Sequence, residues 1–414
     1  MKIAIIGAGV IGLNIAWDLR SAGADVEVLE AGTVGDSASA VNAGWVTPSL
    51  STPLASPGIV GQGIRHMFDR DGALVFRPQP DTQWMKWLWN FSRAARPKVY
   101  ERGVKALLGL NRQTMDLFDE LEDDGVQFEM RRAGILALAL QPGGLGWFRQ
   151  LFDELVPLGF TGGIDYLSPA EAHALDPAAG AHVAEAARTT LDRFVDPDGL
   201  IQGLLARVTD MGVAVHQNRP VQAMRKNGHG WVISTPSGEL SADQVIVALG
   251  AATNKVLSSV GVSLPIIGAR GYSVELTGRG TPPKHAFYLM ESKLGLSPFE
   301  RGVRIAGVFE LPGGEGPVPQ RRLDQLLEQT KPYLGDWIPD AATVTKGRGG
   351  LRPATPDSLP FIGPVPDHEG LFVAAGHGML GVTLAPATAR AMRSMVMDRS
   401  IPEHALPFQL AGRV

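Results

Sequence analysis

Three glycines near the start of the chain are spaced to hold a phosphate group. Gly7, Gly9 and Gly12 follow the apolar residues 3–6, and a helix-compatible segment runs from there to Arg20. The first glycine allows a tight turn, the second lets the backbone approach a pyrophosphate, and the third lets the helix pack closely on the strand. The positive end of the helix dipole favours the phosphate charge. This spacing predicts the phosphate site of a bound dinucleotide.

An acidic residue completes the N-terminal unit. A second apolar strand, residues 26–29, ends on Glu30, at the separation from the glycines that such sites use. A carboxylate at this point can accept hydrogen bonds from ribose hydroxyls, and it argues against the 2′-phosphate of NADP. The alternative is a glycine-rich turn in another kind of βαβ unit. Strand, helix, second strand and acid together favour a nucleotide site and leave NAD and FAD both open.

The composition excludes several other kinds of chemistry. The 414 residues include no cysteine, so disulfides, thiolate catalysis, iron–sulfur clusters and a cysteinyl flavin link are excluded. The histidines and acids show no metal-ligand spacing, and we predict no metal. The net charge of −4 does not favour nucleic-acid binding. No apolar run approaches the ~18 residues of a membrane span, and glycines interrupt the apolar N-terminus, which argues against a signal peptide. We expect a cytoplasmic protein.

A second block of chemically suggestive residues lies near the C-terminus. Gly350-Leu-Arg352-Pro is followed by Leu359-Pro-Phe-Ile-Gly363-Pro and then by Gly376-His377-Gly378-Met-Leu-Gly381-Val-Thr383. Further motifs are Ser39-Ala-Val-Asn42-Ala43-Gly44, Trp84-Met-Lys-Trp-Leu-Trp89 and Gly271-Tyr272-Ser273. Together with the N-terminal unit, their order resembles the D-amino-acid oxidase and glycine oxidase superfamily of FAD-dependent oxidoreductases. Within it, the chain is most similar to the bacterial D-amino-acid dehydrogenase small-subunit family, over essentially its full length.

The resemblance implies FAD as the cofactor, held mostly by backbone groups. The N-terminal motif would bind the ADP half, residues 42–44 would pass beside the flavin, and Val221 would hold the adenine side. Residues 248–250 would lie near the pyrophosphate, and 376–383 would wrap the ribityl chain and the pyrimidine ring, where helix N–H groups suit an electron-rich flavin. The implied cofactor-binding residues are Gly7, Ala8, Gly9, Val10, Ile11, Gly12, Glu30, Ala31, Ser37, Ser39, Asn42, Ala43, Gly44, Val221, Ala248, Leu249, Gly250, Gly376, His377, Gly378, Met379, Leu380, Gly381, Val382 and Thr383.

Three side chains are implied in catalysis by the same resemblance. Arg352 would bind the substrate carboxylate, because a guanidinium makes a planar bidentate contact and keeps its charge. Tyr272 would line the substrate pocket, although a half-buried strand tyrosine is the alternative. His377 would hydrogen-bond or tune the flavin, a structural histidine being equally compatible with its position; covalent attachment of FAD through a histidine stays open.

The implied reaction is oxidative deamination of a D-amino acid. A neutral amine substrate would transfer its Cα hydrogen as hydride to flavin N5, and water would hydrolyse the imino acid to a 2-keto acid and ammonia, with FAD carrying the difficult chemistry. Val382 stands where many close relatives carry a bulky aromatic residue. D-Hydroxyproline, D-proline or another cyclic or N-methyl amino acid is therefore an alternative substrate. A non-catalytic flavin-binding subunit of an oxidoreductase complex is an alternative of another class. The electron acceptor stays open between quinone, oxygen and a partner protein.

The elements that position these groups indicate an α/β protein with two parts. Residues 243–250 and 370–376 read as apolar strands ending in glycine, as at a cofactor-facing strand tip. The predicted fold is a Rossmann-like FAD-binding domain with an inserted mixed-sheet, α+β substrate domain. We expect residues 1–80, 163–265 and 345–414 in the first and residues 81–162 and 266–344 in the second.

One basic, tryptophan-containing segment allows two interpretations. Residues 62–105 combine Lys and Arg with Trp84, Trp87 and Trp89. Tryptophan and basic residues suit a membrane surface, so a weak peripheral contact with the inner face of the membrane is one reading. A helix that packs its aromatic side on the core is the favoured one.

Overall fold

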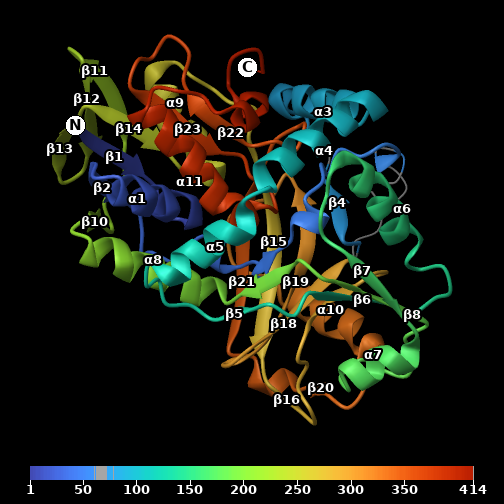
Figure 1. The fold of residues 1–414 in the computed structure, drawn as a ribbon. Coiled ribbons are helices and arrows are strands. Elements are labelled where there is room, and N and C mark those ends of the chain that lie inside the picture. The colour runs from blue at the N-terminus through green and yellow to red at the C-terminus, as the bar shows by residue number, and fades with distance from the viewer. Residues whose placement is uncertain (60, 62–71, 78, 414) are drawn as a thin grey trace.

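The computed structural model describes residues 1–59, 61, 72–77 and 79–413. Its strands form two large sheets with helices packed around them (Figure 1). The strands of the first sheet come from the two ends and the middle of the chain, and those of the second lie between residues 74 and 354. Both sheets are therefore assembled from segments that are distant in sequence.

The first sheet carries the predicted nucleotide motif and has the strand order β10-β2-β1-β14-β23-β22. Neighbouring strands pair in parallel, except that β22 is antiparallel to β23. The bounds are β1 (Lys2–Ile6), β2 (Asp25–Leu29), β10 (Ala214–His216), β14 (Gln244–Val247), β22 (Phe361–Pro364) and β23 (Leu371–Ala375). The strands are largely apolar because both faces are covered. Ile3 and Ile5 pack with the helices on one face, and Ala4 and Ile6 with a small sheet on the other.

Helices α1 (Val10–Ser21), α8 (Pro197–Asp210) and α11 (Gly381–Met397) cover the first of these faces, with α1 against both of the others. A three-stranded antiparallel sheet covers the second face. Its strands are β11 (Ala223–Asn227), β12 (Gly230–Thr235) and β13 (Gly238–Ala242). The apolar faces of α1 and α11 are thus buried on this side of the first sheet.

The second sheet is mixed and has the order β21-β15-β19-β18-β17-β6-β8-β7, with β4 paired to β19. The bounds are β4 (Leu74–Phe76), β6 (Ile135–Ala139), β7 (Ile164–Leu167), β8 (Glu185–Thr189), β15 (Ile267–Leu276), β17 (Ala286–Leu289), β18 (Leu294–Phe299), β19 (Gly302–Leu311) and β21 (Lys346–Ala354). Helix α10 (Gln320–Thr330) lies against one face, where Leu326 packs with Val274 and Ile305. The opposite face is left for the site described below.

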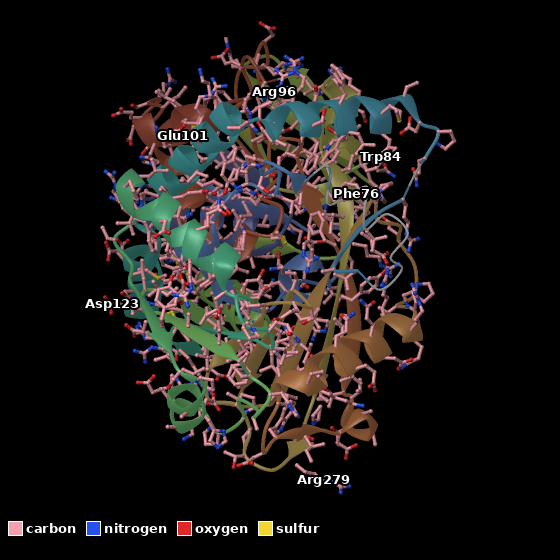
Figure 2. All side chains as sticks on the ribbon, turned by 90° about the vertical axis from the view of Figure 1, so that its right-hand side faces the viewer. Phe76, Trp84, Arg96, Glu101, Asp123 and Arg279 are labelled. Atoms are coloured by element: carbon pink, nitrogen blue, oxygen red, sulfur yellow. The ribbon has the colours of Figure 1, made fainter. Side chains whose placement is uncertain are left out.

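The other described strands are short, and the other described α-helices lie around the two sheets. They are β3 (Trp45–Val46), β5 (Met130–Arg131), β9 (Arg193–Val195), β16 (Gly278–Arg279), β20 (Ile338–Pro339), α3 (Thr82–Ala94), α4 (Pro97–Asn111), α5 (Thr114–Asp123), α6 (Gly146–Leu155), α7 (Pro169–Leu175) and α9 (Thr253–Leu257). Helices α3 and α4 run along the top of the molecule, where Trp84, Arg96 and Glu101 mark their course above Phe76 of β4 (Figure 2).

The structure confirms the predicted fold class, and strand pairing departs from the predicted domain boundaries. Strands β4, β7, β8 and β21 were expected in the cofactor part, but they pair in the second sheet. Helices α4 and α5 were expected in the substrate part, but they pack on α11. Local patterns identify a strand and do not show its partner, because pairing is decided by contacts distant in sequence. The division into two domains itself stays a prediction.

Part of the basic segment at 62–105 lies outside the described residues, namely 62–71 and 78. In the described part, Trp84 and Trp87 of α3 are buried and stack on one another, with ring centroids 5.7 Å apart. Met85 and Trp89 of the same helix are exposed. No helix in the described part of the chain has the length and apolar character needed to cross a membrane.

Candidate active site

A cavity of about 1720 Å³ is lined by residues of both large sheets. The first sheet contributes the start of α1, the end of β2, residues after β14, and the segment that opens α11. The second contributes a surface of small residues on β18, β19 and β21, including Gly295, Gly307 and Gly350. The volume exceeds the 300–1,000 Å³ typical of small-molecule sites, which is room for a large cofactor together with a substrate.

The glycines of the N-terminal motif are required by close backbone contacts. Gly7 has φ +110°, and a Cβ atom there would lie 2.5 Å from the carbonyl oxygen of Ala248 at the end of β14. A Cβ on Gly12 would lie 1.9 Å from the carbonyl oxygen of Gly7. The N-cap of α1 is Gly9, which has no side chain to cap the helix. Ser39 Oγ accepts from the N–H of Val10 at 3.1 Å, and the next N–H groups of the first turn of α1 are left as donors for a pyrophosphate.

Glu30 is held at the end of β2 by two backbone donors. Its Oε2 accepts from the N–H of Ala8 at 2.8 Å, and its Oε1 accepts from the N–H of Gly32 at 3.1 Å. An ionised carboxylate has about four lone-pair positions, so two such bonds fix its orientation and leave acceptors for ribose hydroxyls. Glu30 and Ala31 both line the cavity. The predicted ribose site is compatible with this arrangement.

The segment that opens α11 faces the same cavity. Gly376 and Gly378 have φ of +86° and +56°, so this turn uses the left-handed conformation that glycine adopts readily. Helix α11 begins at Gly381 without a side-chain cap. Residues 378–382 line the cavity. The free N–H groups at the start of α11 suit an electron-rich ring system, which fits the pyrimidine end of FAD.

His377 lies in this turn but is turned toward α11. Its Nε2 lies 3.0 Å from Oγ1 of Thr388, and the side chain is 3% exposed. Burial lowers the pKa of His377 to about 3, so the ring is neutral at physiological pH. His377 thus borders the cavity as an uncharged group fixed by the helix.

Arg352 presents a cation to the cavity without a carboxylate partner among the described residues. Its Nη1 donates to the carbonyl oxygen of Val308 at 2.6 Å, and its guanidinium lies 5.6 Å from the ring centroid of Phe309. Burial lowers the pKa of Arg352 to about 10, which still leaves the group charged at neutral pH. A partly desolvated cation without an ion pair is costly, and a bound anion would offset that cost.

Tyr272 does not lie where the resemblance implied. It is 1% exposed, does not line the cavity, and packs in the core beneath α10. Its hydroxyl donates to Oε2 of Glu310 at 2.9 Å. Side chains alternate between the two faces of a strand, and in β15 this residue falls on the face covered by the helix. The expected substrate-pocket role of Tyr272 is therefore not supported by the geometry.

A different tyrosine faces the cavity. Tyr288 of β17 lines it together with Trp45 and Trp147, whose rings meet Tyr288 edge-on at centroid distances of 5.6 and 6.3 Å. Burial raises the pKa of its hydroxyl above the ordinary value, so Tyr288 is a neutral donor. The Nζ atom of Lys293 lies 5.7 Å from its ring centroid. The sequence marks Tyr288 only as one residue of an apolar strand, since its partners are distant in sequence.

Most of the predicted cofactor residues line the cavity, and a minority do not. Those that line it are Gly7, Gly9, Val10, Ile11, Glu30, Ala31, Ser37, Ser39, Asn42, Ala43, Ala248, Leu249, Gly250, His377, Gly378, Met379, Leu380, Gly381 and Val382. Those that do not are Ala8, Gly12, Gly44, Val221, Gly376 and Thr383.

Some of the residues that do not line the cavity have identifiable structural roles. Thr383 Oγ1 accepts from the N–H of Thr47 and donates to the carbonyl of Trp45, both at 3.1 Å, so it ties α11 to β3. A Cβ on Gly44, which has φ +76°, would lie 1.9 Å from the carbonyl oxygen of Val195. Val221 packs against the core beneath the three-stranded sheet.

Comparisons with known proteins agree with the geometry. The profile of a family described as FAD dependent oxidoreductase (DAO) matches residues 2–395. A D-amino acid dehydrogenase of Neisseria meningitidis serogroup C is 28% identical over 411 residues, covering 96% of both chains. One of Cereibacter sphaeroides is 28% identical, covering 97% of this chain and 92% of the relative.

Solved structures show the same fold. Glycine oxidase from Geobacillus kaustophilus superposes with a TM-score of 0.76 at 22% identity, covering 100% of this chain and 99% of that one. Iminodiacetate oxidase from Chelativorans sp. BNC1 gives a TM-score of 0.72 at 20% identity, covering 98% of each. A profile match over nearly the whole chain, and a cavity lined by the nucleotide motif, lead to one conclusion: the chain belongs to the DAO family of FAD-dependent oxidoreductases.

Proposed function

We propose that this protein oxidises D-amino acids to 2-keto acids and ammonia as an FAD-dependent dehydrogenase or oxidase. The single observation that carries the proposal is Arg352, a cation in the cavity with a carbonyl contact but no carboxylate partner among the described residues. A substrate carboxylate supplies the missing anion through a charge-assisted, bidentate contact. The relatives named D-amino acid dehydrogenase add support for the substrate class.

The protein's own groups orient the substrate rather than react with it. Arg352 holds the carboxylate, and Tyr288, Trp45 and Trp147 border the cavity on the side of the second sheet. Tyr288 and Val308 stand on the two strands that flank β18, and Gly295 of β18, paired with Tyr288, lines the cavity without a side chain that would fill the space above the sheet. FAD, when bound, supplies the acceptor for the hydride that leaves Cα.

The substrate amine is used in its neutral form. Desolvation disfavours a charged ammonium group and so lowers the pKa of an amine that enters the cavity. His377, with a pKa of about 3, is a poor proton acceptor near neutral pH. We infer that the proton leaves the amine to solvent as the substrate binds, without His377 as its acceptor. Water hydrolyses the resulting imino acid to the keto acid and ammonia.

A cyclic secondary amino acid, such as D-proline or D-hydroxyproline, is a second candidate substrate. Val382 lines the cavity at the start of α11, with a smaller side chain than an aromatic residue. Gly295, Ala306 and Gly307 line the opposite surface with little side-chain volume. Such space accepts a ring close to the cofactor. A non-catalytic flavin subunit has no need for Arg352, and we favour it less.

Anaerobic bleaching of the bound flavin tests the proposal. The purified holoprotein is mixed with single D- and L-amino acids, including proline and hydroxyproline, and the visible absorbance of the flavin is followed. We expect D-amino acids to bleach the flavin and their L-enantiomers to leave its spectrum unchanged. Retention of full absorbance with every D-amino acid would contradict the proposed activity. Repeating the assay with oxygen or a soluble quinone then identifies the acceptor.

We also propose a cytoplasmic location with at most weak contact with a membrane surface. Helix α3 buries Trp84 and Trp87, which supports a packing role for its aromatic residues, and it exposes Met85 and Trp89. Sedimentation with liposomes, with and without anionic lipid, measures the contact. We expect little binding, with Trp89→Ala behaving like the wild type; strong binding lost in that variant would contradict this view.

A further inference from the structure

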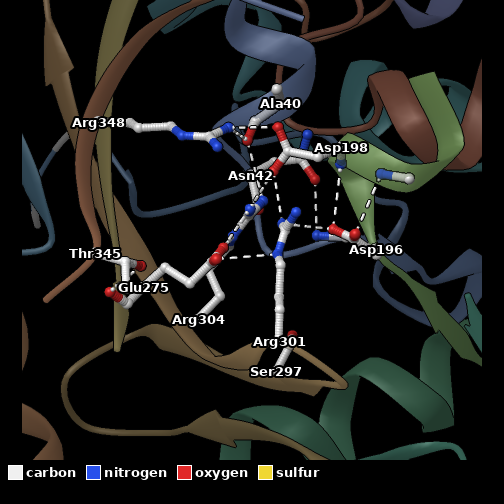
Figure 3. A network of polar contacts seen from close by, with 12 residues as sticks. Ala40, Asn42, Asp196, Asp198, Glu275, Ser297, Arg301, Arg304, Thr345 and Arg348 are labelled. Carbon is white, nitrogen blue, oxygen red and sulfur yellow. Dashed lines mark hydrogen bonds and ion pairs between the residues drawn. The ribbon is translucent and has the colours of Figure 1, made fainter. Parts of the chain in front are cut away.

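A balanced cluster of charges, buried at Arg304 and 36% exposed at Arg301, lies against the loop at residues 38–43 (Figure 3). We call it the arginine network; its members are Arg301, Arg304, Arg348, Asp196, Asp198 and Glu275. Three cations face three anions, and the cluster joins the second sheet to the N-terminus of α8. Replacing a buried ion pair by apolar residues is often neutral for stability, so such a cluster calls for an explanation besides folding energy.

The ion pairs do not use all the donors of the arginines. Arg304, which is 1% exposed, contacts Asp198 and Glu275 through Nη2. Its Nη1 is directed instead to the carbonyl oxygens of Ala40 at 3.0 Å and Asn42 at 3.3 Å. Arg348 Nη1 also donates to the Ala40 carbonyl, at 2.9 Å. The network therefore reaches beyond itself to the backbone of one loop.

A third carbonyl of this loop is held in the same way. Ser297 Oγ on β18 donates to the carbonyl oxygen of Ala43 at 2.7 Å and accepts from Nε1 of Trp45 at 2.9 Å. Within the loop, Asn42 Oδ1 accepts from the N–H of Gly44 at 2.7 Å. Three carbonyl dipoles of one short segment are thus directed toward donors of the second sheet.

The loop borders the cavity on its other side. Ser39, Asn42 and Ala43 line it, and Ser39 Oγ accepts from the N–H of Val10 in the first turn of α1 at 3.1 Å. A carbonyl oxygen released from the network would be free to turn toward the cavity. Its partial negative charge would then oppose the binding and the reduction of an electron-rich ring system.

We propose that Arg304 is a positioning residue for the cofactor: it fixes the carbonyls of Ala40 and Asn42 away from the cavity and thereby keeps the loop in the form that binds FAD. Arg348 and Ser297 complete the arrangement at Ala40 and Ala43. The inference uses the family's cofactor and is independent of which substrate the protein oxidises. It also gives Arg304 and Arg348 a role besides ion pairing, since each donates to a carbonyl of this loop.

Asp198, which pairs with Arg304 and Arg348, stays ionised at ordinary pH. Burial opposes ionisation of Asp198, but hydrogen bonds from Arg348 and Arg304 outweigh it and lower its pKa to about 2. The carboxylate therefore stays ionised and continues to orient both guanidinium groups.

The test compares variants that differ in whether they touch the loop. Arg304→Met removes the donor to Ala40 and Asn42. Arg301→Met is the control from the same network: Arg301 is 36% exposed and pairs with Asp196, Asp198 and Glu275 without donating to a carbonyl of the loop. Ser297→Ala removes the donor to Ala43 without a change of charge. It keeps the test decisive if Arg304→Met does not fold.

FAD release on dilution of each holoprotein is followed by the fluorescence of the free cofactor, and the visible spectrum and reduction potential of the retained flavin are recorded. We expect FAD affinity to fall about tenfold or more in Arg304→Met and measurably in Ser297→Ala, the change expected for lost hydrogen bonds of this kind. Both should shift the flavin absorption and lower its reduction potential. Arg301→Met should stay within about twofold of wild type.

Two outcomes would overturn the proposal. The first is a folded Arg304→Met variant that keeps the FAD affinity and the flavin spectrum of the wild type. If Arg304→Met does not fold, the same result in Ser297→Ala counts against the proposal. The other is an equal loss in Arg301→Met, which would make the network a general structural element. Because these readouts need no substrate, failure of the proposed amino-acid oxidation leaves them unaffected.

Discussion

The guanidinium of Arg352 lies directly against Gly271 on the neighbouring strand. A Cβ atom at Gly271 would lie 1.9 Å from Nη1 of Arg352. Strand β15 therefore carries a glycine where the arginine crosses it to reach the Val308 carbonyl on β19. The position of the cation in the cavity depends on the absence of a side chain one strand away.

Gly271→Ala should displace Arg352 while leaving the cofactor bound. The added methyl group occupies the space of the guanidinium, so we expect the KM for the amino-acid substrate to rise by about tenfold with the flavin spectrum retained. Steady-state kinetics with the best substrate from the bleaching panel measures this. Gly314→Ala is the control for a general glycine effect, since no atom lies within 4 Å of a Cβ there. A wild-type KM in Gly271→Ala would show that the guanidinium can move without weakening substrate binding.

Arg352→Met should separate substrate binding from stability. Loss of the charge-assisted contact should raise the substrate Kd by ~10²-fold or more in a protein that still binds FAD. Removing a partly desolvated cation that has no ion pair with any described residue should leave the thermal midpoint unchanged or higher. Substrate titration of the flavin spectrum and thermal unfolding give the two values. Unchanged substrate affinity would remove Arg352 from the binding site.

Tyr288→Phe and Tyr272→Phe should have opposite consequences. Tyr288 borders the cavity, so its hydroxyl should matter for kcat/KM, by about fivefold to tenfold for one hydrogen bond. Tyr272 donates to the buried Glu310, so its loss should cost stability, about 1 kcal/mol, with kcat/KM near wild type. Kinetics and denaturant unfolding of both variants distinguish them. The reverse pattern would restore the substrate role implied for Tyr272 by family resemblance.

His377 should make the folded protein sensitive to acid and leave the rate profile unchanged. Burial lowers its pKa to about 3, whereas an unfolded histidine titrates near 6.5. Between these values the unfolded chain binds a proton that the folded chain does not, so stability falls as pH falls, by about 1.4 kcal/mol per pH unit at most. Unfolding of His377→Asn should show a shallower decline between pH 6.5 and 3.

The limiting rate of flavin reduction should rise with pH through one ionisation of the substrate amine, alike in wild type and His377→Asn. Stopped-flow measurement of flavin reduction from acidic to alkaline pH, in both proteins, tests whether the rate profile is unchanged in the variant. A pH-independent rate would contradict the use of a neutral amine, and an ionisation lost in the variant would identify His377 as the base.

The backbone conformation of the candidate cofactor segments was largely predictable because its determinants are local. Gly7, Gly12 and Glu30 lie in one βαβ unit, where a tight turn, a close helix and a strand end follow from residue type and spacing. The turn at Gly376 and Gly378 is local in the same sense. For these segments the backbone conformation is decided within a few residues, so the sequence pattern and the structure agree.

The substrate side was less predictable because it depends on which face of a strand a residue occupies and which strands pair. Tyr272 and Tyr288 both lie on apolar strands of the second sheet, and their sequences do not show that one faces α10 and the other the cavity. The same holds for β7, β8 and β21, whose partners come from distant segments.

By itself, the sequence determined the nucleotide unit, the family resemblance and the candidate carboxylate-binding arginine, since each is carried by residue type and short-range spacing. Only the tertiary structure decided that Tyr288 replaces Tyr272 at the cavity, that Gly271 makes room for Arg352, and that Arg304 holds the loop at Ala40. These relationships join strands and loops far apart in the chain, and their energies arise only when packing brings those segments together.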